Sequence, residues 1–270
     1  LPINTDLTRR ILTGFIRSEI TRMGFSRAVI GLSGGIDSAV SCFLAAEALG
    51  GENVLAVRMP YRTSSPDSLE DAQRVIEATG VQSLTVEITP MVEPLFQRFP
   101  DMDNMRRGNI MARQRMIILY DQSAAFGGLV VGTGNKTEIL LGYTTLYGDS
   151  ACALNPIGDL YKTQLRQLAE ALGVPESIRR KAPSADLWAG QTDEGELGYT
   201  YAEVDRLLYL LVDQRYTPQE CVEAGVEPSF VHRVVERMRR NQFKRILPPL
   251  AKLSNRTIGY DFLYLRDWGT

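Results

Sequence analysis

Residues 27–40 constrain this chain more than any other segment. The segment opens with an apolar run, passes through the adjacent glycines Gly34 and Gly35, and continues as an apolar helical pattern. A strand that leads through a glycine turn into a helix directs backbone N–H groups and the positive end of the helix dipole at an anion. The segment therefore predicts a phosphate-binding loop.

This loop differs from the phosphate loops of kinases and GTPases, in which a Lys follows the glycines. It has Asp37 in the first helical turn instead, with hydroxyls at Ser33 and Ser38 as further donors. A carboxylate repels phosphates unless a cation lies between them, so Asp37 predicts a bridging hard metal with oxygen ligands, Mg²⁺. Alone, Asp37 is equally explained as an acidic residue that stabilises a helix N-terminus by about 0.3–1 kcal/mol.

Short apolar segments alternate with helical patterns along the first half of the chain. Strands are predicted at residues 28–32, 53–59, 83–88 and 128–132, and helices at residues 7–23, 37–49, 69–79 and 104–126. The alternation predicts an α/β fold with a Rossmann-like, doubly wound parallel sheet and ligands at the carboxyl ends of the strands. Extra C-terminal helices are expected at residues 162–172, 199–214, 218–224 and 229–240, within one domain over residues 1–270.

Composition and charge argue against several classes of protein. A net charge of −2 disfavours a nucleic-acid binder, which needs a broad basic surface. No apolar run reaches the roughly 18 residues of a membrane span, and no basic segment followed by an apolar one opens the chain, so we expect a cytoplasmic protein.

The three cysteines have no pairing or metal spacing, which favours a reducing compartment. The only histidine, His232, falls in a predicted polar helix away from the glycine loop, so histidine-based catalysis is not expected.

Two further segments leave alternatives open. A basic cluster is best explained as a solvated helix face whose charges suit the C-terminal end of the helix dipole; its members are Arg233, Arg237, Arg239, Arg240, Lys244 and Arg245. Residues 183–198 are rich in Gly, Asp and Glu and lack periodicity, which predicts a long loop. Such a loop is either a lid or binding loop, or an ordinary solvated connection.

Ordered sequence blocks resemble one enzyme family. Ser-Gly-Gly-x-Asp-Ser after an apolar strand resembles the pyrophosphate loop of the N-type ATP pyrophosphatases, which cleave ATP between its α and β phosphates to activate a carboxyl or carbonyl oxygen. Within that superfamily, the chain resembles the short form of NAD synthetase, which has no glutaminase domain. Seven blocks in family order carry this resemblance: residues 31–38, 58–65, 108–116, 132–138, 147–149, 155–163 and 183–188.

The resemblance implies an adenine nucleotide α-hydrolase-like fold and a ligase activity. In the implied reaction, ATP adenylates the carboxylate of deamido-NAD (nicotinic acid adenine dinucleotide), pyrophosphate leaves, and ammonia then displaces AMP to give NAD. The implied cofactor is Mg²⁺, and the implied assembly is a homodimer with neither nucleic-acid nor membrane partners. Glutamine would serve only through a separate glutaminase that supplies ammonia.

The same resemblance implies roles for individual residues. Asp37 and Glu138 are expected to bind the metal and, with Lys162, to form the catalytic set, in which Lys162 neutralises charge on the departing pyrophosphate. The expected ATP contacts are Gly31, Leu32, Ser33, Gly34, Gly35, Ile36, Asp37, Ser38, Arg58, Thr133, Lys162 and Ser184. The expected contacts of the dinucleotide are Arg113, Tyr143, Asp149 and Lys244.

Local structure offers competing explanations for several of these residues. Glu138 lies three residues after Asn135, which is the spacing of a helix capping box. Lys162 follows an expected N-cap at Asp159, and helix stability does not explain it, because a cation in the first turn opposes the helix dipole. A surface ion pair would explain Arg58, and a turn or an N-cap would explain Ser184.

The chain departs from the family pattern at the dinucleotide end of the site. Many members have a Lys before the Tyr-Gly-Asp tripeptide and an Asp four residues after its Asp, whereas this chain has Leu146 and Ala153. Dinucleotide binding is therefore either weaker or supported by neighbours such as Tyr143, Asp149 or Asn155. Two rival functions stay open: an adenylating enzyme with another carboxyl or carbonyl substrate, and a non-catalytic module that senses nucleotides.

Overall fold

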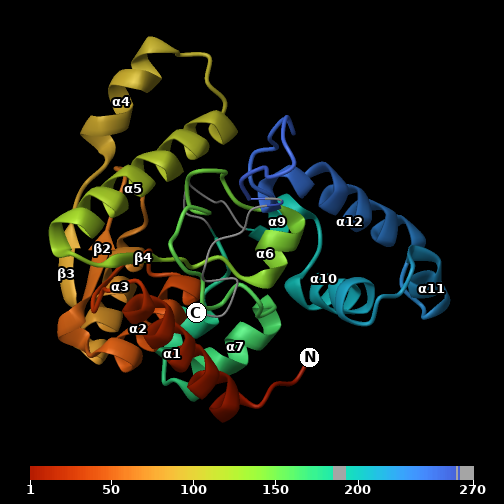
Figure 1. Cartoon of the computed structure of the whole chain (residues 1–270), viewed down its shortest axis with the longest axis horizontal. Coiled ribbons are helices and arrows are strands. Elements are labelled where there is room, and N and C mark those ends of the chain that lie inside the picture. Colours follow the sequence, from red (N-terminus) through yellow and green to blue (C-terminus); the bar gives the residue numbers. More distant parts are fainter. Residues whose placement is uncertain (185–192, 260, 262–270) are drawn as a thin grey trace.

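A parallel sheet of four short strands forms the centre of the fold (Figure 1). The computed structural model describes residues 1–184, 193–259 and 261. The strands lie in the order β3-β2-β1-β4 and span Ala28–Gly31 (β1), Val54–Arg58 (β2), Gln82–Thr85 (β3) and Leu129–Val131 (β4). Ala28 at the start of β1 lies opposite Val54 of β2 and Leu129 of β4. The predicted α/β fold with a parallel sheet is confirmed.

Helices cover both faces of the sheet because side chains along each strand alternate between two cores. In β1, Ala28 and Ile30 pack into one core and Val29 into the other. The first core contains side chains from α1 (Thr5–Arg22), α2 (Ile36–Leu49), α3 (Pro66–Thr79) and α7 (Lys162–Ala171). The second contains side chains from α4 (Thr89–Arg98) and α5 (Asn104–Phe126). The doubly wound arrangement is therefore as expected.

The C-terminal third packs a core of its own beside the sheet. This core buries Leu141 of α6, Leu207 of α10, and Val231 and Val234 of α12. It also buries Tyr161, which precedes α7. Besides α7, the α-helices after β4 in the described residues are α6 (Lys136–Leu141), α8 (Glu176–Arg180), α9 (Asp193–Leu197), α10 (Tyr201–Leu208), α11 (Pro218–Glu223) and α12 (Pro228–Arg240). A short π-helix spans Tyr209–Asp213, and 3₁₀ helices span Gly51–Asn53 and Gln242–Arg245. This helical bundle stands to the right of the sheet in Figure 1.

Several elements differ from the sequence-based expectations. The third strand ends at Thr85 rather than at residue 88. The helices α4, α6 and α8 were not predicted, and the helix expected at 199–214 is α10 followed by the π-helix. Of the long loop expected at 183–198, residues 185–192 lie outside the described residues, and Asp193–Leu197 form the helix α9. In the parts of the chain that the structure covers, every helix is too short or too polar to cross a membrane.

Candidate active site

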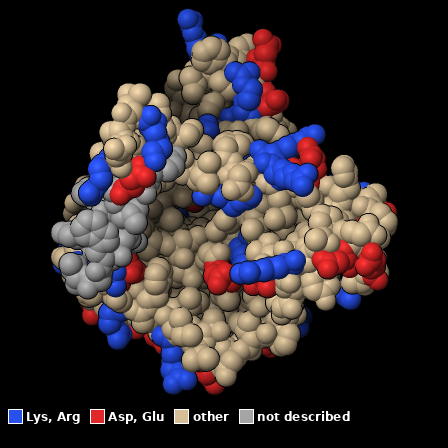
Figure 2. All heavy atoms as spheres, turned by 45° about the vertical axis from the view of Figure 1, so that its right-hand side comes forward, with Lys and Arg blue, Asp and Glu red and all other residues tan. Residues whose placement is uncertain are grey.

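A large pocket opens at the carboxyl ends of the parallel strands. Its volume is 1380 Å³, and Gly31, Arg58 and Val131, at the ends of β1, β2 and β4, line it. Figure 2 shows a hollow in this face of the molecule with Lys and Arg side chains on its rim. Binding sites of α/β sheets occur at this edge, so the position agrees with the sequence-based expectation.

The glycine loop is held in shape by its own serines. The Oγ atoms of Ser33 and Ser38 lie 3.0 Å apart, and the Ser38 hydroxyl also donates to the Gly35 carbonyl over 3.0 Å. Gly34 has φ of +79°, and Gly35 is the N-cap of α2. A Cβ at Gly34 would lie 2.1 Å from the Ser68 carbonyl oxygen of α3, so only glycine lets the loop approach this helix. The loop thus aims the N-terminus of α2 at the pocket, as a phosphate site requires.

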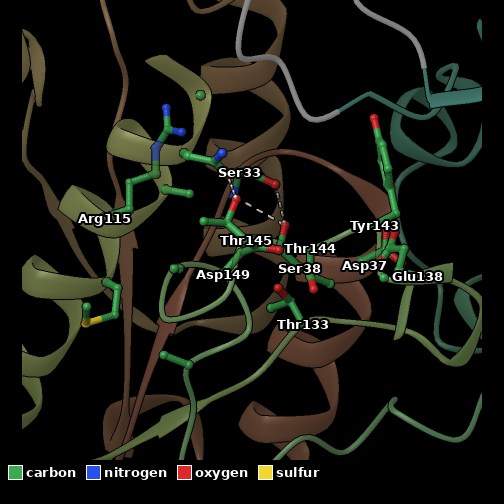
Figure 3. Close-up of a pocket in the computed structure, with 18 of the residues that line it drawn as sticks. Ser33, Asp37, Ser38, Arg115, Thr133, Glu138, Tyr143, Thr144, Thr145 and Asp149 are labelled. Carbon is green, nitrogen blue, oxygen red and sulfur yellow. Dashed lines mark hydrogen bonds between the residues drawn. The ribbon is translucent and has the colours of Figure 1, made fainter. Parts of the chain in front are cut away.

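Asp37 and Glu138 meet across the ends of β1 and β4, and the ammonium of Lys162 lies between them. Lys162 Nζ is 2.5 Å from Asp37 Oδ2 and 3.4 Å from Glu138 Oε1. The other Asp37 oxygen accepts a hydrogen bond of 2.8 Å from Asn135 Nδ2. Figure 3 shows Asp37, Glu138 and Tyr143 grouped on one side of the pocket, near the hydrogen-bonded Ser33 and Ser38. The expected convergence of the two carboxylates is confirmed.

Glu138 also caps α6, as its spacing from Asn135 predicted. The Glu138 N–H donates to Asn135 Oδ1 over 3.0 Å, and Glu138 Oε2 accepts from the Asn135 N–H over 3.2 Å. These reciprocal bonds form the capping box that the spacing predicted. They leave the second Glu138 oxygen, Oε1, facing Lys162 and Asp37.

The charges in this group strongly perturb one another. Burial and the neighbouring Asp37 carboxylate raise the pKa of Glu138 from 4.5 to about 8. Burial alone would lower the pKa of the Lys162 ammonium, but Asp37 and Glu138 raise it above its ordinary value. When both carboxylates are ionised, the single buried cation leaves surplus negative charge, which a further cation would neutralise.

A buried carboxylate fixes the start of the helix that carries Lys162. Asp205, only 1% exposed, accepts hydrogen bonds from the Thr137 hydroxyl over 2.5 Å and from the Thr163 N–H over 2.8 Å. Thr137 in turn accepts from the Lys162 N–H over 3.1 Å. The N-cap of α7 is Tyr161, so the expected N-cap at Asp159 was wrong, although Lys162 does lie in the first turn. Asp159 forms an ion pair with Lys136 instead.

A third acidic residue lies on the far side of the carboxylate pair. Asp193 is 4% exposed and accepts hydrogen bonds from the hydroxyls of Tyr143, over 3.2 Å, and Tyr201, over 3.0 Å. The ring of Tyr201 faces Lys162 Nζ, 5.1 Å from its centroid. Burial raises the pKa of Asp193, while Lys162 lowers it. Sequence analysis missed Asp193, because no motif marks it and its neighbours come from three separate elements.

The structure places most of the expected site residues on the pocket. Those that line it are Gly31, Leu32, Ser33, Asp37, Ser38, Arg58, Thr133, Glu138, Tyr143, Asp149 and Lys244. Four expected residues do not line the pocket. Three of them belong to the glycine loop and the start of α2, namely Gly34, Gly35 and Ile36, and the fourth, Lys162, lies behind the carboxylates. Arg113 and Ser184 are exposed and lie off the wall, and Arg113 Nε donates to the Leu146 carbonyl over 3.2 Å. Residues 185–188 of the block at residues 183–188 lie outside the described residues.

The pocket also contains residues that sequence analysis assigned elsewhere. Arg233, Arg237 and Arg240 of the basic cluster line the pocket, and Arg233 and Arg240 are also exposed, so the predicted solvated face is at the same time a wall of the pocket. His232 likewise lies on the pocket wall, contrary to expectation. The sequence could not reveal this, because which face of α12 turns toward the pocket depends on the packing of its apolar stripe against α6 and α11. Arg115, across the pocket in Figure 3, donates to the Met59 carbonyl over 3.0 Å and was also missed.

Comparisons with known proteins agree with this geometry. The NAD synthase family description matches residues 8–248. An NH(3)-dependent NAD(+) synthetase of Trichlorobacter lovleyi is 62% identical over 100% of this chain and 98% of its own length. The structure of an NMN synthetase from Francisella tularensis superposes with a TM-score of 0.83 at 32% identity, covering 93% of this chain and 100% of the other. An NH3-dependent NAD synthetase from Campylobacter jejuni gives 0.79 at 33% identity, with the same coverage. The chain therefore belongs to the NAD synthase family.

Proposed function

We propose that this chain amidates deamido-NAD with ammonia and ATP, forming NAD, AMP and pyrophosphate. The observation that carries the proposal is the pairing of Asp37 and Glu138 beside a phosphate loop that lacks the Lys of kinases. Such an arrangement suits attack at the α phosphorus of ATP, with the β and γ phosphates over Gly34 and Gly35. The names of relatives more than half identical over the whole chain support this set of substrates.

Mg²⁺ fits the carboxylate pair. Both ligands are oxygens, and among the described residues no group of three or more His, Cys, Asp or Glu forms a fuller metal site. Mg²⁺ is usually held by one or two carboxylates together with substrate phosphates and water, so Asp37 and Glu138 suffice. Bound there, it would supply charge neutralisation and Lewis-acid polarisation of the α phosphate.

The remaining ATP contacts are proposed from the donors at the strand ends. Arg58 Nε is buried without a hydrogen-bond partner at the end of β2, a donor that a nucleotide would satisfy. Thr133 offers a hydroxyl at the end of β4. From behind the carboxylates, the ammonium of Lys162 would add positive potential at the departing pyrophosphate. For Ser184 the proposal rests on the family resemblance alone.

The chemistry requires two displacements. A carboxylate oxygen of the nicotinate forms a bond to the α phosphorus, and the bond from that phosphorus to pyrophosphate breaks. The ammonia lone pair then adds to the activated carbonyl carbon, AMP leaves with the bridging oxygen, and the nitrogen loses a proton. Proximity and exclusion of water matter more here than a strong base. The side chains of Tyr143, Asp193 and Tyr201 pack beside the carboxylates at the place where water must be excluded.

Arg113 and the assembly are proposed together. Arg113 is exposed beyond the pocket wall, so it reaches a dinucleotide only where the ligand crosses the rim. We propose a homodimer, for which exposed apolar side chains on α4 and α5 provide a surface: Met91, Leu95, Met105, Ile117 and Tyr120.

We further propose that residues 1–270 form one synthetase domain, since the family match spans most of this length. The free thiols of Cys42 and Cys221, both buried, support a reducing, cytoplasmic setting.

A second candidate substrate is the mononucleotide of nicotinic acid. Leu146 and Ala153 replace two polar residues at the dinucleotide end, and a structural neighbour is titled an NMN synthetase. The pocket volume of 1380 Å³ favours the dinucleotide, because pockets for single small ligands are usually about 300–1,000 Å³.

One incubation separates these functions. Purified protein with ATP, Mg²⁺ and ammonium receives either deamido-NAD or the mononucleotide, and the nucleotides are separated by chromatography. We expect NAD and AMP in equal amounts, with kcat/KM higher for deamido-NAD. Substrate-dependent release of ADP and inorganic phosphate would refute the mechanism. Turnover of the mononucleotide alone would select the second candidate, and turnover of neither would leave a nucleotide-sensing module or another substrate.

A further inference from the structure

One face of α12 and the turn after it forms a continuous wall of the pocket. The wall residues recur at spacings of one, three and four, as one side of a helix requires: His232, Arg233, Glu236, Arg237, Arg240, Asn241 and Lys244. The opposite stripe of the helix, with Val231 and Val234 at its centre, is buried in the C-terminal core. Packing of the apolar stripe therefore fixes the polar face toward the pocket.

This face is strongly cationic, with Arg233, Arg237, Arg240 and Lys244 against the single carboxylate of Glu236. Of these cations, only Arg240 has an ion pair within the described part of the chain, at 2.7 Å from Glu236. Arg233 donates a hydrogen bond to the Ser229 hydroxyl over 3.0 Å and lies over the Phe230 ring, 6.0 Å from its centroid. Arg233 and Arg240 are exposed at the pocket, and three of the four cations lack an ion pair among the described residues, so this wall suits an anionic ligand.

Two of the cations are tied to the segment where the family's polar residues are missing. Lys244 Nζ donates to the carbonyl oxygens of Gly142 and Thr144, both over 2.7 Å, just before Leu146. Arg237 Nε donates to the Leu141 carbonyl over 3.3 Å, and its guanidinium lies 5.8 Å from the ring centroid of Tyr143. These contacts hold the basic face of α12 against the segment that lacks the Lys and the Asp.

The glycine at this junction brings the two segments together. A Cβ at Gly142 would lie 2.2 Å from the Cβ of Asn241 at the end of α12. The φ of Gly142 is +63°, a conformation that glycine adopts without strain. The position of the basic face relative to Tyr143 is therefore built into the fold.

We propose that the basic face of α12, with Arg233 and Arg240 as its anchors, binds the phosphates of the nucleotide that carries the carboxylate to be amidated. The ATP phosphates occupy the glycine loop at the sheet, so the second anionic substrate requires a second cationic wall in the same pocket. This wall supplies the attraction that Leu146 and Ala153 do not. The inference rests on the proposed function and names the residues that recognise its second substrate.

Single charge removals on one helix test the proposal. Arg233→Gln and Arg240→Gln each take one cation from the wall, and Arg239→Gln takes one from an exposed position of α12 that does not line the pocket. Binding of deamido-NAD and, separately, of ATP with Mg²⁺ is measured by calorimetry. We expect each wall variant to weaken deamido-NAD binding roughly tenfold, as loss of a charge-assisted hydrogen bond does. Binding of ATP and of deamido-NAD by Arg239→Gln should change less than about twofold.

Ligands that differ only in phosphate identify what the wall recognises. Wild-type protein should bind the mononucleotide of nicotinic acid more tightly than the riboside, which has the same base and sugar without phosphate. In the Arg233→Gln, Arg240→Gln double variant this preference should disappear. The proposal is overturned if the double variant loses as much affinity for the riboside as for the mononucleotide. It is also overturned if the wall variants lose as much affinity for ATP as for deamido-NAD, or if their loss of deamido-NAD affinity is no larger than that of Arg239→Gln. A normal calorimetric response to ATP verifies that the variants are folded.

Failure of the inference and failure of the proposed function give different results. If wild-type protein binds deamido-NAD through the wall but does not convert it to NAD, the proposed activity is wrong and the binding site stands. If wild-type protein forms NAD and the wall variants bind deamido-NAD as tightly as the wild type, the activity stands and this inference is wrong. Absence of deamido-NAD binding by the wild type overturns both.

Discussion

Gly34→Ala should disrupt the glycine loop through one backbone contact. The Ala Cβ would lie 2.1 Å from the Ser68 carbonyl oxygen, 2.9 Å from its carbon and 3.0 Å from Ser68 Cα. Carbon and oxygen atoms pack at roughly 3.5 Å, so the loop or the first turn of α3 must move by more than an ångström. Both line the pocket through Ser33 and Ser68, so the displacement should weaken ATP binding as well as folding.

The matched control is Gly80→Ala at the end of α3. Gly80 also has positive φ, +66°, but a Cβ there meets no atom within 4 Å. Each substitution costs about 1–2 kcal/mol because Ala disfavours this backbone region. Gly34→Ala adds an overlap term of about 1–3 kcal/mol, typical of overpacking. We expect a total loss of about 2–5 kcal/mol for Gly34→Ala against about 1–2 kcal/mol for Gly80→Ala.

Urea unfolding measures the two free energies of unfolding, and calorimetry measures ATP affinity. Gly80→Ala should leave ATP binding unchanged, because Gly80 lies at the opposite end of α3 from Ser68. Equal losses of stability in the two variants, with ATP affinity retained by Gly34→Ala, would refute the reasoning that contact with α3 shapes the loop.

Three further predictions concern the site. Glu138→Gln should keep the capping box, since Gln also serves there, and lower turnover by at least about 100-fold; a stability loss of about 1 kcal/mol with normal turnover would reduce Glu138 to a helix cap. Because the folded-state pKa of Glu138 is raised from 4.5 to about 8, the metal-free folded protein binds more protons than the unfolded one between these values, so its stability falls as pH rises through this window. Urea unfolding at both ends of the window should show this fall in the wild type and a smaller one in Glu138→Gln. Leu146→Lys with Ala153→Asp should lower the KM for deamido-NAD; an unchanged KM would mean that these positions do not face the dinucleotide.

The elements with clear boundary residues could be predicted from the sequence. The helix expected at 104–126 is α5, which begins after an N-cap at Asp103 and ends before the left-handed Gly127. The helix α4 was missed because Pro90 and Pro94 both fall within it; the first suits an N-terminal turn, but the second interrupts the usual helical pattern. The third strand was drawn too long because apolar residues continue past Thr85. Val86 and Ile88 do bond to the carbonyls of Arg58 and Pro60, but outside the regular strand.

The candidate site was predictable where local motifs carry it. The glycine loop predicted a turn into a helix, and the ends of parallel strands predicted that Asp37 and Glu138 would meet. Asp193 and the basic face of α12 were not predictable, because their positions depend on how the C-terminal helices pack across α6. The ion pair of Lys162 with both carboxylates was also missed, since sequence reasoning assigned its charge to a phosphate alone.

Transfer of oxygen tests the central claim most directly. Deamido-NAD labelled with ¹⁸O in its nicotinate carboxylate is converted with ATP, Mg²⁺ and ammonium, and the AMP is examined by mass spectrometry. If a carboxylate oxygen attacks the α phosphorus and leaves with AMP, each AMP carries one labelled oxygen and each NAD keeps the other. AMP without label, formed together with NAD, would contradict an adenylated intermediate at this site.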